Sequence, residues 1–242
     1  TSELGYLEQS RRPVPVLVFI LPLVIAYEAA ITISSFGDLP GIAARGLLAE
    51  FFDLFGVAGL HVPAAALVVS LVSIQLVRHG LRPAAWRFTP LVPVGIAVEG
   101  AALALPLLML SAMVGGVRPA IVSQAAVGDE SGSIAETLAL AIGAGLYEEM
   151  VFRMLGFALV GVVLEDLAGL SRRVWIPIGL IVTAIAFAAF HGTPGNDGSG
   201  YGRFLFYVFA GVYFGLLYIA RGFGVAVGAH TIYDIIALLP DG

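Results

Sequence analysis

The sequence has no cysteine and no lysine, and only 12% of its 242 residues carry a charge. Without cysteine, disulfides, thiolate zinc sites and a cysteine nucleophile are all excluded. All 12 basic residues are arginine, which removes Schiff-base chemistry and serine–lysine catalytic pairs. The net charge of −5 and the lack of a basic run argue against nucleic acid as a partner.

Apolar residues are what the sequence has in excess. Hydrophobic residues make up 59% of the chain and the mean hydropathy is +0.98, whereas a soluble domain carries about 25% charged residues. We therefore predict an integral membrane protein whose first partner is the lipid bilayer. The fold class we expect is all-α, with residues 1–242 forming a single polytopic transmembrane helix bundle.

About seven apolar runs are long enough to cross a bilayer, which takes about 20 residues; six or eight spans are also compatible with the pattern. The fourth run is expected to be long and tilted. Residues 36–59 are predicted to hold a short interfacial amphipathic helix, and 115–133 to form a loop. The runs are Val14–Ser35, Leu60–Val77, Leu91–Val114, 134–164, Val174–Phe190, 203–220 and 223–239.

The arginines divide unequally when the seven spans are assigned to alternate sides. Eight fall on the side of the N-terminus and three on the other, so the positive-inside rule predicts a cytoplasmic N-terminus. A chain rich in alanine and with arginine as its only basic residue also looks bacterial, which indicates the inner (plasma) membrane. The eight are Arg11, Arg12, Arg78, Arg82, Arg87, Arg172, Arg173 and Arg221, and the three are Arg45, Arg118 and Arg203.

Small residues recur at a four-residue spacing in the last two runs. Gly211 and Gly215 form one pair, and Gly224 and Gly228 form the other. Because such a spacing lets helix backbones approach closely, we interpret these glycines as packing residues.

Three charged residues lie within six positions of the fourth run. Glu148, Glu149 and Arg153 stand in an otherwise apolar segment, where each buried charge costs about 2.5–3.5 kcal/mol. Glu149 and Arg153 are four residues apart and can pair on one helix face. Glu148 is rotated by about 100° from Glu149 and points elsewhere. The pattern therefore predicts one neutralised acid and one acid that is free to face a cavity.

Two further polar clusters follow: one lies at the end of the fifth run and the other lies within the seventh. Taken alone, His191 is typical of a helix cap, and His230 could simply pair with Asp234 on one helix face. His61 and His79 lie near span ends and are interpreted as interfacial. Together, a glutamate, two histidines and an aspartate that converge in a bundle would suffice to activate water and to stabilise an oxyanion.

These clusters resemble the motifs of a known protein family. The patterns Glu148-Glu149-x-x-x-Arg153, Phe187-x-x-x-His191 and His230-x-x-x-Asp234 resemble, in order, the three motifs of the CAAX-processing and bacteriocin-processing (CPBP) membrane protease family. The eukaryotic member of this family is the Ras-converting endopeptidase. The resemblance covers about residues 134–239, which would form the catalytic core. Each motif alone is a weak signal, and all three in order are a strong one.

The resemblance implies an intramembrane endopeptidase that uses no metal or other cofactor. It implies that Glu148 is the general base that activates water together with His191. It further implies that His230 and Asp234 bind the scissile carbonyl and its oxyanion, although an aspartate donates a hydrogen bond only when it is protonated. The supporting residues would be Glu149, Arg153 and Phe187. The expected substrate is a membrane-anchored protein or peptide.

Alternatives remain open at this stage. In a zinc peptidase, His191, His230 and a carboxylate would bind the metal, although the sequence has no HExxH motif. A scaffold, an immunity protein or a transporter subunit would retain the fold without catalysis, because buried ionisable residues also mark transport pathways. Glu28 and Glu99 match no motif of the family and are interpreted as structural. The sequence leaves the oligomeric state open.

Overall fold

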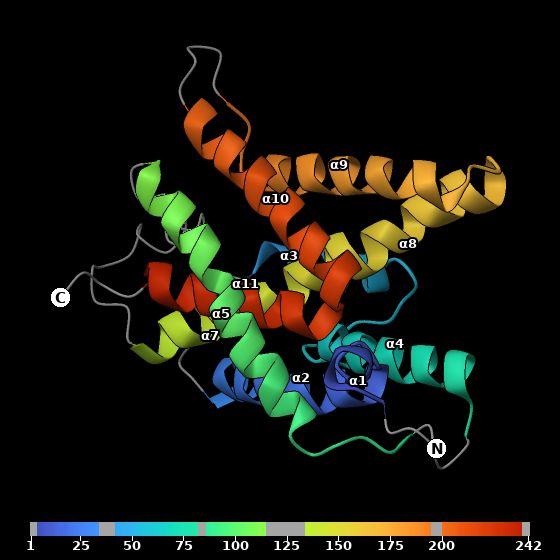
Figure 1. Ribbon diagram of the computed structural model, residues 1–242. Helices are drawn as coiled ribbons and strands as arrows, with labels where there is room; N and C mark the ends of the chain where they lie inside the picture. Colours follow the sequence, from blue (N-terminus) through green and yellow to red (C-terminus); the bar gives the residue numbers. More distant parts are fainter. Residues whose placement is uncertain (1–3, 34–41, 82–85, 115–133, 195–199, 239–242) are drawn as a thin grey trace.

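The computed structural model describes residues 4–33, 42–81, 86–114, 134–194 and 200–238 (Figure 1). Within these ranges the regular structure is helical, which confirms the predicted fold class. The helices are α1 (Tyr6–Gln9), α2 (Pro13–Ile33), α3 (Ala43–Asp53), α4 (Val62–His79), α5 (Val92–Met113), α7 (Ile134–Glu149), η3 (Met150–Leu155), α8 (Gly156–Gly161), η4 (Val162–Leu167), α9 (Arg172–Phe190), α10 (Tyr201–Arg221) and α11 (Phe223–Leu238).

All seven apolar runs predicted as spans are helical. By length and composition, five of the described helices could cross a membrane: α2, α4, α5, α9 and α10. The seventh run, α11, is apolar but has only 16 residues. The predicted interfacial helix corresponds to α3, which turns Leu47 and Phe51 outward and is followed by the exposed Leu54. The loop predicted at 115–133 lies outside the described residues.

The fourth run, predicted to be long and tilted, is helical from Ile134 to Leu167 but changes its hydrogen-bond register along the way. After α7 ends at Glu149, the chain continues as the π-helical segment η3, the short helix α8 and a second π-helical segment, η4. A π turn is wider than an α turn and is frequent at functional sites. Here η3 directly follows the two glutamates and contains Arg153. The run is thus helical over its whole predicted length, while apolar length alone does not predict its hydrogen-bond register.

The last helix, α11, lies in the centre of the bundle and packs on α5, α7, α10 and α2. Glycine allows the closest approaches. A Cβ on Gly100 of α5 would lie 2.9 Å from the backbone carbonyl carbon of Gly228, and one on Gly145 of α7 would overlap Thr231. The predicted packing role of Gly228 is therefore confirmed. Figure 1 shows α5 crossing α11 obliquely, while α10 runs obliquely down to the start of α11.

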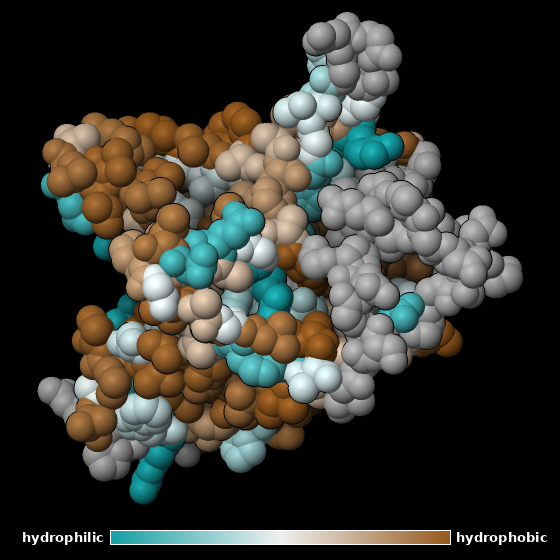
Figure 2. Space-filling view, turned by 180° about the vertical axis from the view of Figure 1, so that it is seen from behind, coloured by the Kyte–Doolittle hydropathy of each residue, from teal (hydrophilic) through white to brown (hydrophobic). Residues whose placement is uncertain are grey.

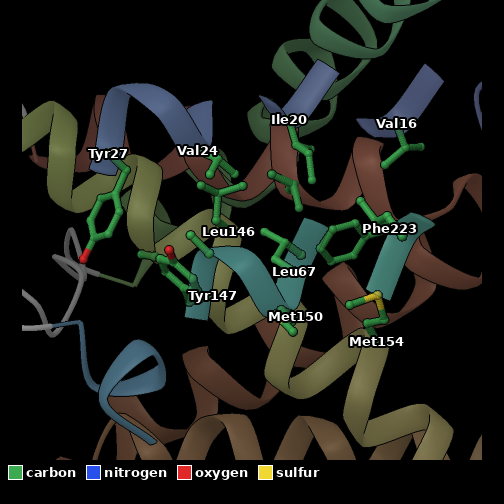
Figure 3. Packing of buried hydrophobic residues seen from close by; sticks show 14 of the residues in the cluster. Val16, Ile20, Val24, Tyr27, Leu67, Leu146, Tyr147, Met150, Met154 and Phe223 are labelled. Atoms are coloured by element: carbon green, nitrogen blue, oxygen red, sulfur yellow. The ribbon is translucent and has the colours of Figure 1, made fainter. Parts of the chain in front are cut away.

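A hydrophobic core joins α2, α4, α7 and the start of α11 (Figure 3). Mostly large apolar side chains fill it, and their burial supports the position of α7 against α2. Among them are Ile20, Val24, Leu67, Leu146, Met150 and Phe223.

The two acids interpreted as structural both have partners. Glu99 pairs with Arg221 and accepts a 2.6 Å hydrogen bond from Tyr6. Burial and the Glu99 carboxylate raise the pKa of Tyr6 to about 12, so this hydroxyl stays a donor. Glu28 accepts a 2.8 Å hydrogen bond from Tyr147 and pairs with His61. These contacts tie α1 to α5 and α10, and α2 to α7 and α4.

Candidate active site

The structure brings the four candidate catalytic residues together from three helices. Glu148 lies in the last turn of α7, His191 caps the C-terminus of α9, and His230 and Asp234 lie one turn apart in α11. Glu148, His230 and Asp234 are at most 4% exposed. A set of polar groups from separate helices is thus gathered in the interior of an apolar bundle.

Both imidazole rings are held through Nδ1. The Nδ1 of His191 lies 2.8 Å from the carbonyl oxygen of Phe187, and the Nδ1 of His230 lies 2.8 Å from the Oε1 of Glu149. Because a carbonyl oxygen only accepts hydrogen bonds, His191 donates from Nδ1. In each ring the Nε2 atom is therefore directed toward the remaining polar groups.

The two Nε2 atoms converge on one carboxylate oxygen. The Oε2 of Glu148 lies 3.3 Å from the Nε2 of His191 and 3.8 Å from the Nε2 of His230. The Oδ2 of Asp234 lies 3.5 Å from the same His230 nitrogen. Both oxygens are buried and have no hydrogen-bond partner among the described residues. Buried oxygens of this kind mark a place for a further donor, such as water or a substrate group.

Glu149 and Arg153 form the ion pair that their spacing predicts. The Nη1 of Arg153 lies 3.0 Å from the Oε1 of Glu149, and the two side chains are 1% and 0% exposed. The guanidinium also donates to the carbonyl of Gly211 at 3.2 Å and lies over the Phe187 ring, 4.4 Å from its centroid. Glu149 thus links Arg153 to His230, a connection between helices that the sequence spacing did not predict.

Aromatic side chains of α10 cover both histidines. Tyr207 stacks on His191 with ring centroids 4.2 Å apart, and Phe214 stacks on His230 at 4.5 Å. Sequence reasoning missed both residues. Their seven-residue separation, which places them on one face of α10, was the available signal. Stacking fixes the plane of each imidazole and excludes lipid from it.

A small cavity of about 10 Å³ adjoins these groups. It is lined by both histidines, Asp234, Tyr207 and Tyr233, together with other aromatic side chains. A cavity of about this size is at the lower limit for holding one water molecule. The carboxylate of Asp234 and the imidazoles of His191 and His230 therefore line a space for a small polar group.

In the part of the chain that the structure describes, no three His, Asp or Glu side chains are arranged so that they could hold a metal ion. The zinc alternative would use His191, His230 and a carboxylate as its ligands.

Comparison with protein families adds independent information. Residues 130–236 match the family model described as Rce1-like, Type II CAAX prenyl endopeptidase. This part of the chain is therefore similar to the Rce1-like CAAX protease family. The comparisons with curated proteins and with solved structures found no match.

The matched family consists of CAAX prenyl endopeptidases, which hydrolyse peptide bonds, and the match together with the long apolar helices supports an integral membrane protein. The matched segment includes the two glutamates of α7, both buried histidines and Asp234. The family match concerns activity in general; it does not assign a role to any of these side chains.

Proposed function

We propose that the chain hydrolyses peptide bonds of membrane-anchored substrates with a water molecule activated by Glu148 and His191. The observation that carries this proposal is the convergence of both Nε2 atoms on the Oε2 of Glu148, beside the small cavity. A general base must lie within hydrogen-bond reach of the proton that it takes, directly or through one water. Glu148 does not itself line the cavity, but His191 and His230 do, and their Nε2 atoms lie 3.3 and 3.8 Å from its Oε2, so we assign Glu148 as the base for water held beside these nitrogens.

In the first step, water attacks the scissile carbonyl carbon and its proton passes to Glu148. His191, whose Nδ1 is engaged by the Phe187 carbonyl, keeps its Nε2 beside Glu148 at 3.3 Å. It can share the transferred proton and deliver it to the leaving amine. The carbon–oxygen bond forms as the carbonyl π bond becomes an oxyanion, and the later loss of the amine breaks the C–N bond.

His230 and Asp234 are assigned to the oxyanion. Donation from Nε2 in addition to Nδ1 needs the protonated imidazole of His230, and three carboxylates surround this ring at 2.8, 3.5 and 3.8 Å. Asp234 contributes a hydrogen bond when it carries a proton. Donors fixed in advance in a buried site stabilise developing charge more than mobile water does.

Glu149, Arg153 and Phe187 act as positioning residues in this scheme. Glu149 holds the Nδ1 of His230, and the Phe187 carbonyl holds the Nδ1 of His191. Arg153 balances the charge of Glu149 and lies on the Phe187 ring. None of the three needs to touch substrate.

We further propose that the protein resides in a bacterial inner membrane with its N-terminus in the cytoplasm, as the uneven arginine distribution indicates. Its substrate would be a membrane-tethered peptide or an anchor segment, because the site lies within the bundle and not on a soluble face. No metal takes part in the proposed mechanism.

The test compares the protein termini of membranes from cells that carry the wild type, Glu148→Gln or Glu136→Gln. Loss of a general base typically costs a factor of about 10²–10⁴, so Glu148→Gln should abolish every cleavage that the wild type performs. Glu136 lies three turns earlier in the same helix, outside the site, and its substitution should leave cleavage intact.

A terminus found with the wild type and with Glu136→Gln, but not with Glu148→Gln, would support the protease and identify its substrate. Equal cleavage by Glu148→Gln, expressed at the same level, would refute the assigned role of Glu148. A wild-type phenotype from a variant lacking both Glu148 and His191 would favour the scaffold or transporter alternative.

A further inference from the structure

Two adjoining cavities lie away from the candidate active site, at the end of the bundle where α4 and α10 finish. Their volumes are about 690 and 610 Å³, within the range of about 300–1,000 Å³ typical of small-molecule sites. They share five lining residues, and we call the joint space the arginine groove. The shared residues are Ile74, Arg78, Met154, Tyr218 and Ile219.

The walls of the groove are mostly apolar and belong to helices that meet lipid. Leu71 and Ile74 come from α4, while Met154 and Phe157 come from η3 and α8. In Figure 2 a hollow opens at the left of the view between two hydrophobic masses, on the side where Figure 1 places α4 below α8 and α9. A ligand of the groove is therefore expected to be largely hydrocarbon and to enter from the bilayer.

One end of the groove is cationic, although the chain as a whole has a net charge of −5. Arg78, in the last turn of α4, lines both cavities; Arg11 lines one and Arg172 the other. Glu8 is the one carboxylate among the described lining residues. Arg11 donates to the carbonyl of Ile219 at 3.0 Å, which fixes its guanidinium at the rim.

Aromatic side chains accompany these arginines. Tyr218 lines both cavities and Trp175 lines the one that contains Arg172. Tyrosine and tryptophan are enriched where a membrane protein meets the headgroup layer. The groove thus combines an apolar floor, an aromatic margin and a guanidinium rim, which matches the order of acyl chain, glycerol and phosphate in a phospholipid.

We propose that the arginine groove binds one anionic phospholipid. Arg78 holds the phosphate, because guanidinium groups bind phosphate oxygens in a bidentate manner. Arg11 adds positive charge, whereas Arg172 is already paired with Glu165 at 3.1 Å. The acyl chains lie against Ile74, Met154 and Phe157. Because Met154 follows Arg153 in η3, the bound lipid also contacts the segment that carries the buried ion pair.

The binding test uses the purified full-length chain in micelles, with dioleoyl phosphatidylglycerol as the probe and dioleoyl phosphatidylcholine as the neutral reference. Native mass spectrometry counts retained lipids, and thermal unfolding measures stabilisation. Phosphatidylglycerol should be retained as a single molecule and should raise the unfolding temperature more than phosphatidylcholine. This readout does not require proteolytic activity.

Two variants locate the lipid. One arginine near an anionic membrane surface raises the affinity for anionic lipid by a factor of about five. Arg78→Gln should therefore weaken phosphatidylglycerol binding about fivefold. Arg203→Gln, at the opposite end of α10, is the control and should change nothing. Ser73 is exposed and lines the groove, so Ser73→Trp can fill the space without disturbing packed neighbours and should also weaken binding.

Equal retention of both lipids by the wild type, or equal effects of Arg78→Gln and Arg203→Gln, would overturn the proposal. Displacement of the lipid by millimolar inorganic phosphate would show a site for a free anion, which also overturns it. Unchanged binding by Ser73→Trp would place the lipid outside the groove.

Discussion

The ion pair between Glu149 and Arg153 allows a direct test of what holds the candidate active site together. Its charges are 3.0 Å apart and at most 1% exposed. At an effective dielectric constant of about 20, their attraction is about 5 kcal/mol. Removing two ions from water costs several kcal/mol each, so the intact pair contributes little net stability. Removing one partner is different, because it leaves an uncompensated buried charge.

The perturbation is a double-mutant cycle. Arg153→Met leaves Glu149 with the Nδ1 of His230 as its remaining described partner, and Glu149→Gln leaves the guanidinium with the Gly211 carbonyl and two aromatic faces. Each single substitution should lower the free energy of unfolding by about 3–5 kcal/mol. The double variant removes both charges and should cost less than the sum, with a coupling energy of several kcal/mol.

The assay is titration of the purified protein with sodium dodecyl sulfate in mixed micelles, followed by near-UV circular dichroism. Glu165→Gln serves as the control, because Glu165 pairs with Arg172 at a site where the two side chains are 34% and 77% exposed. It should change the free energy of unfolding by at most about 1 kcal/mol. Strictly additive effects of the two buried substitutions would refute the reasoning, as would an Arg153→Met variant as stable as the control.

Two further predictions concern helix packing and metal dependence. Gly100→Ala should destabilise the protein by about 1–3 kcal/mol in the same titration, because its Cβ would lie 2.9 Å from the Gly228 backbone. The control is Gly46→Ala in α3, which has nothing within 4 Å of its Cβ and should be neutral or slightly stabilising. A Gly46→Ala variant less stable than Gly100→Ala would contradict the close contact of α5 with α11. Cleavage by the wild type should persist in a metal chelator; loss of cleavage with recovery on adding zinc would instead support a zinc site formed by His191, His230 and a carboxylate.

The helices could be predicted because crossing a bilayer imposes a length and an apolar composition that are visible in one sequence. Pairing within a helix was equally accessible: Glu149 and Arg153 meet because residues four apart share a face. The interruption of the fourth span by η3 was not predictable, since no composition signal distinguishes a π turn from an α turn in an apolar run.

Contacts between helices account for what the sequence did not predict at the site. The bond from His230 to Glu149 joins residues 81 positions apart, and no periodicity within one helix encodes such a distance. The stacking of Tyr207 and Phe214 on the histidines likewise depends on how α10 crosses α9 and α11. Glu28 and Glu99, interpreted as structural, have tyrosine partners that come from other helices and that the sequence did not predict.

The short central helix α11 has a consequence for how water reaches the interior. At about 1.5 Å per residue, its 16 residues extend about 24 Å, which is less than the roughly 30 Å hydrocarbon core of a bilayer. It packs on α2, α5, α7 and α10, and most of its side chains are buried, so it need not match the membrane thickness. Asp234 is only four residues from the C-terminal end of α11. Water that enters from that end therefore passes only a short apolar stretch before it reaches the site. A hydrolytic reaction can then draw its second reactant from the aqueous phase while its peptide substrate arrives from the bilayer.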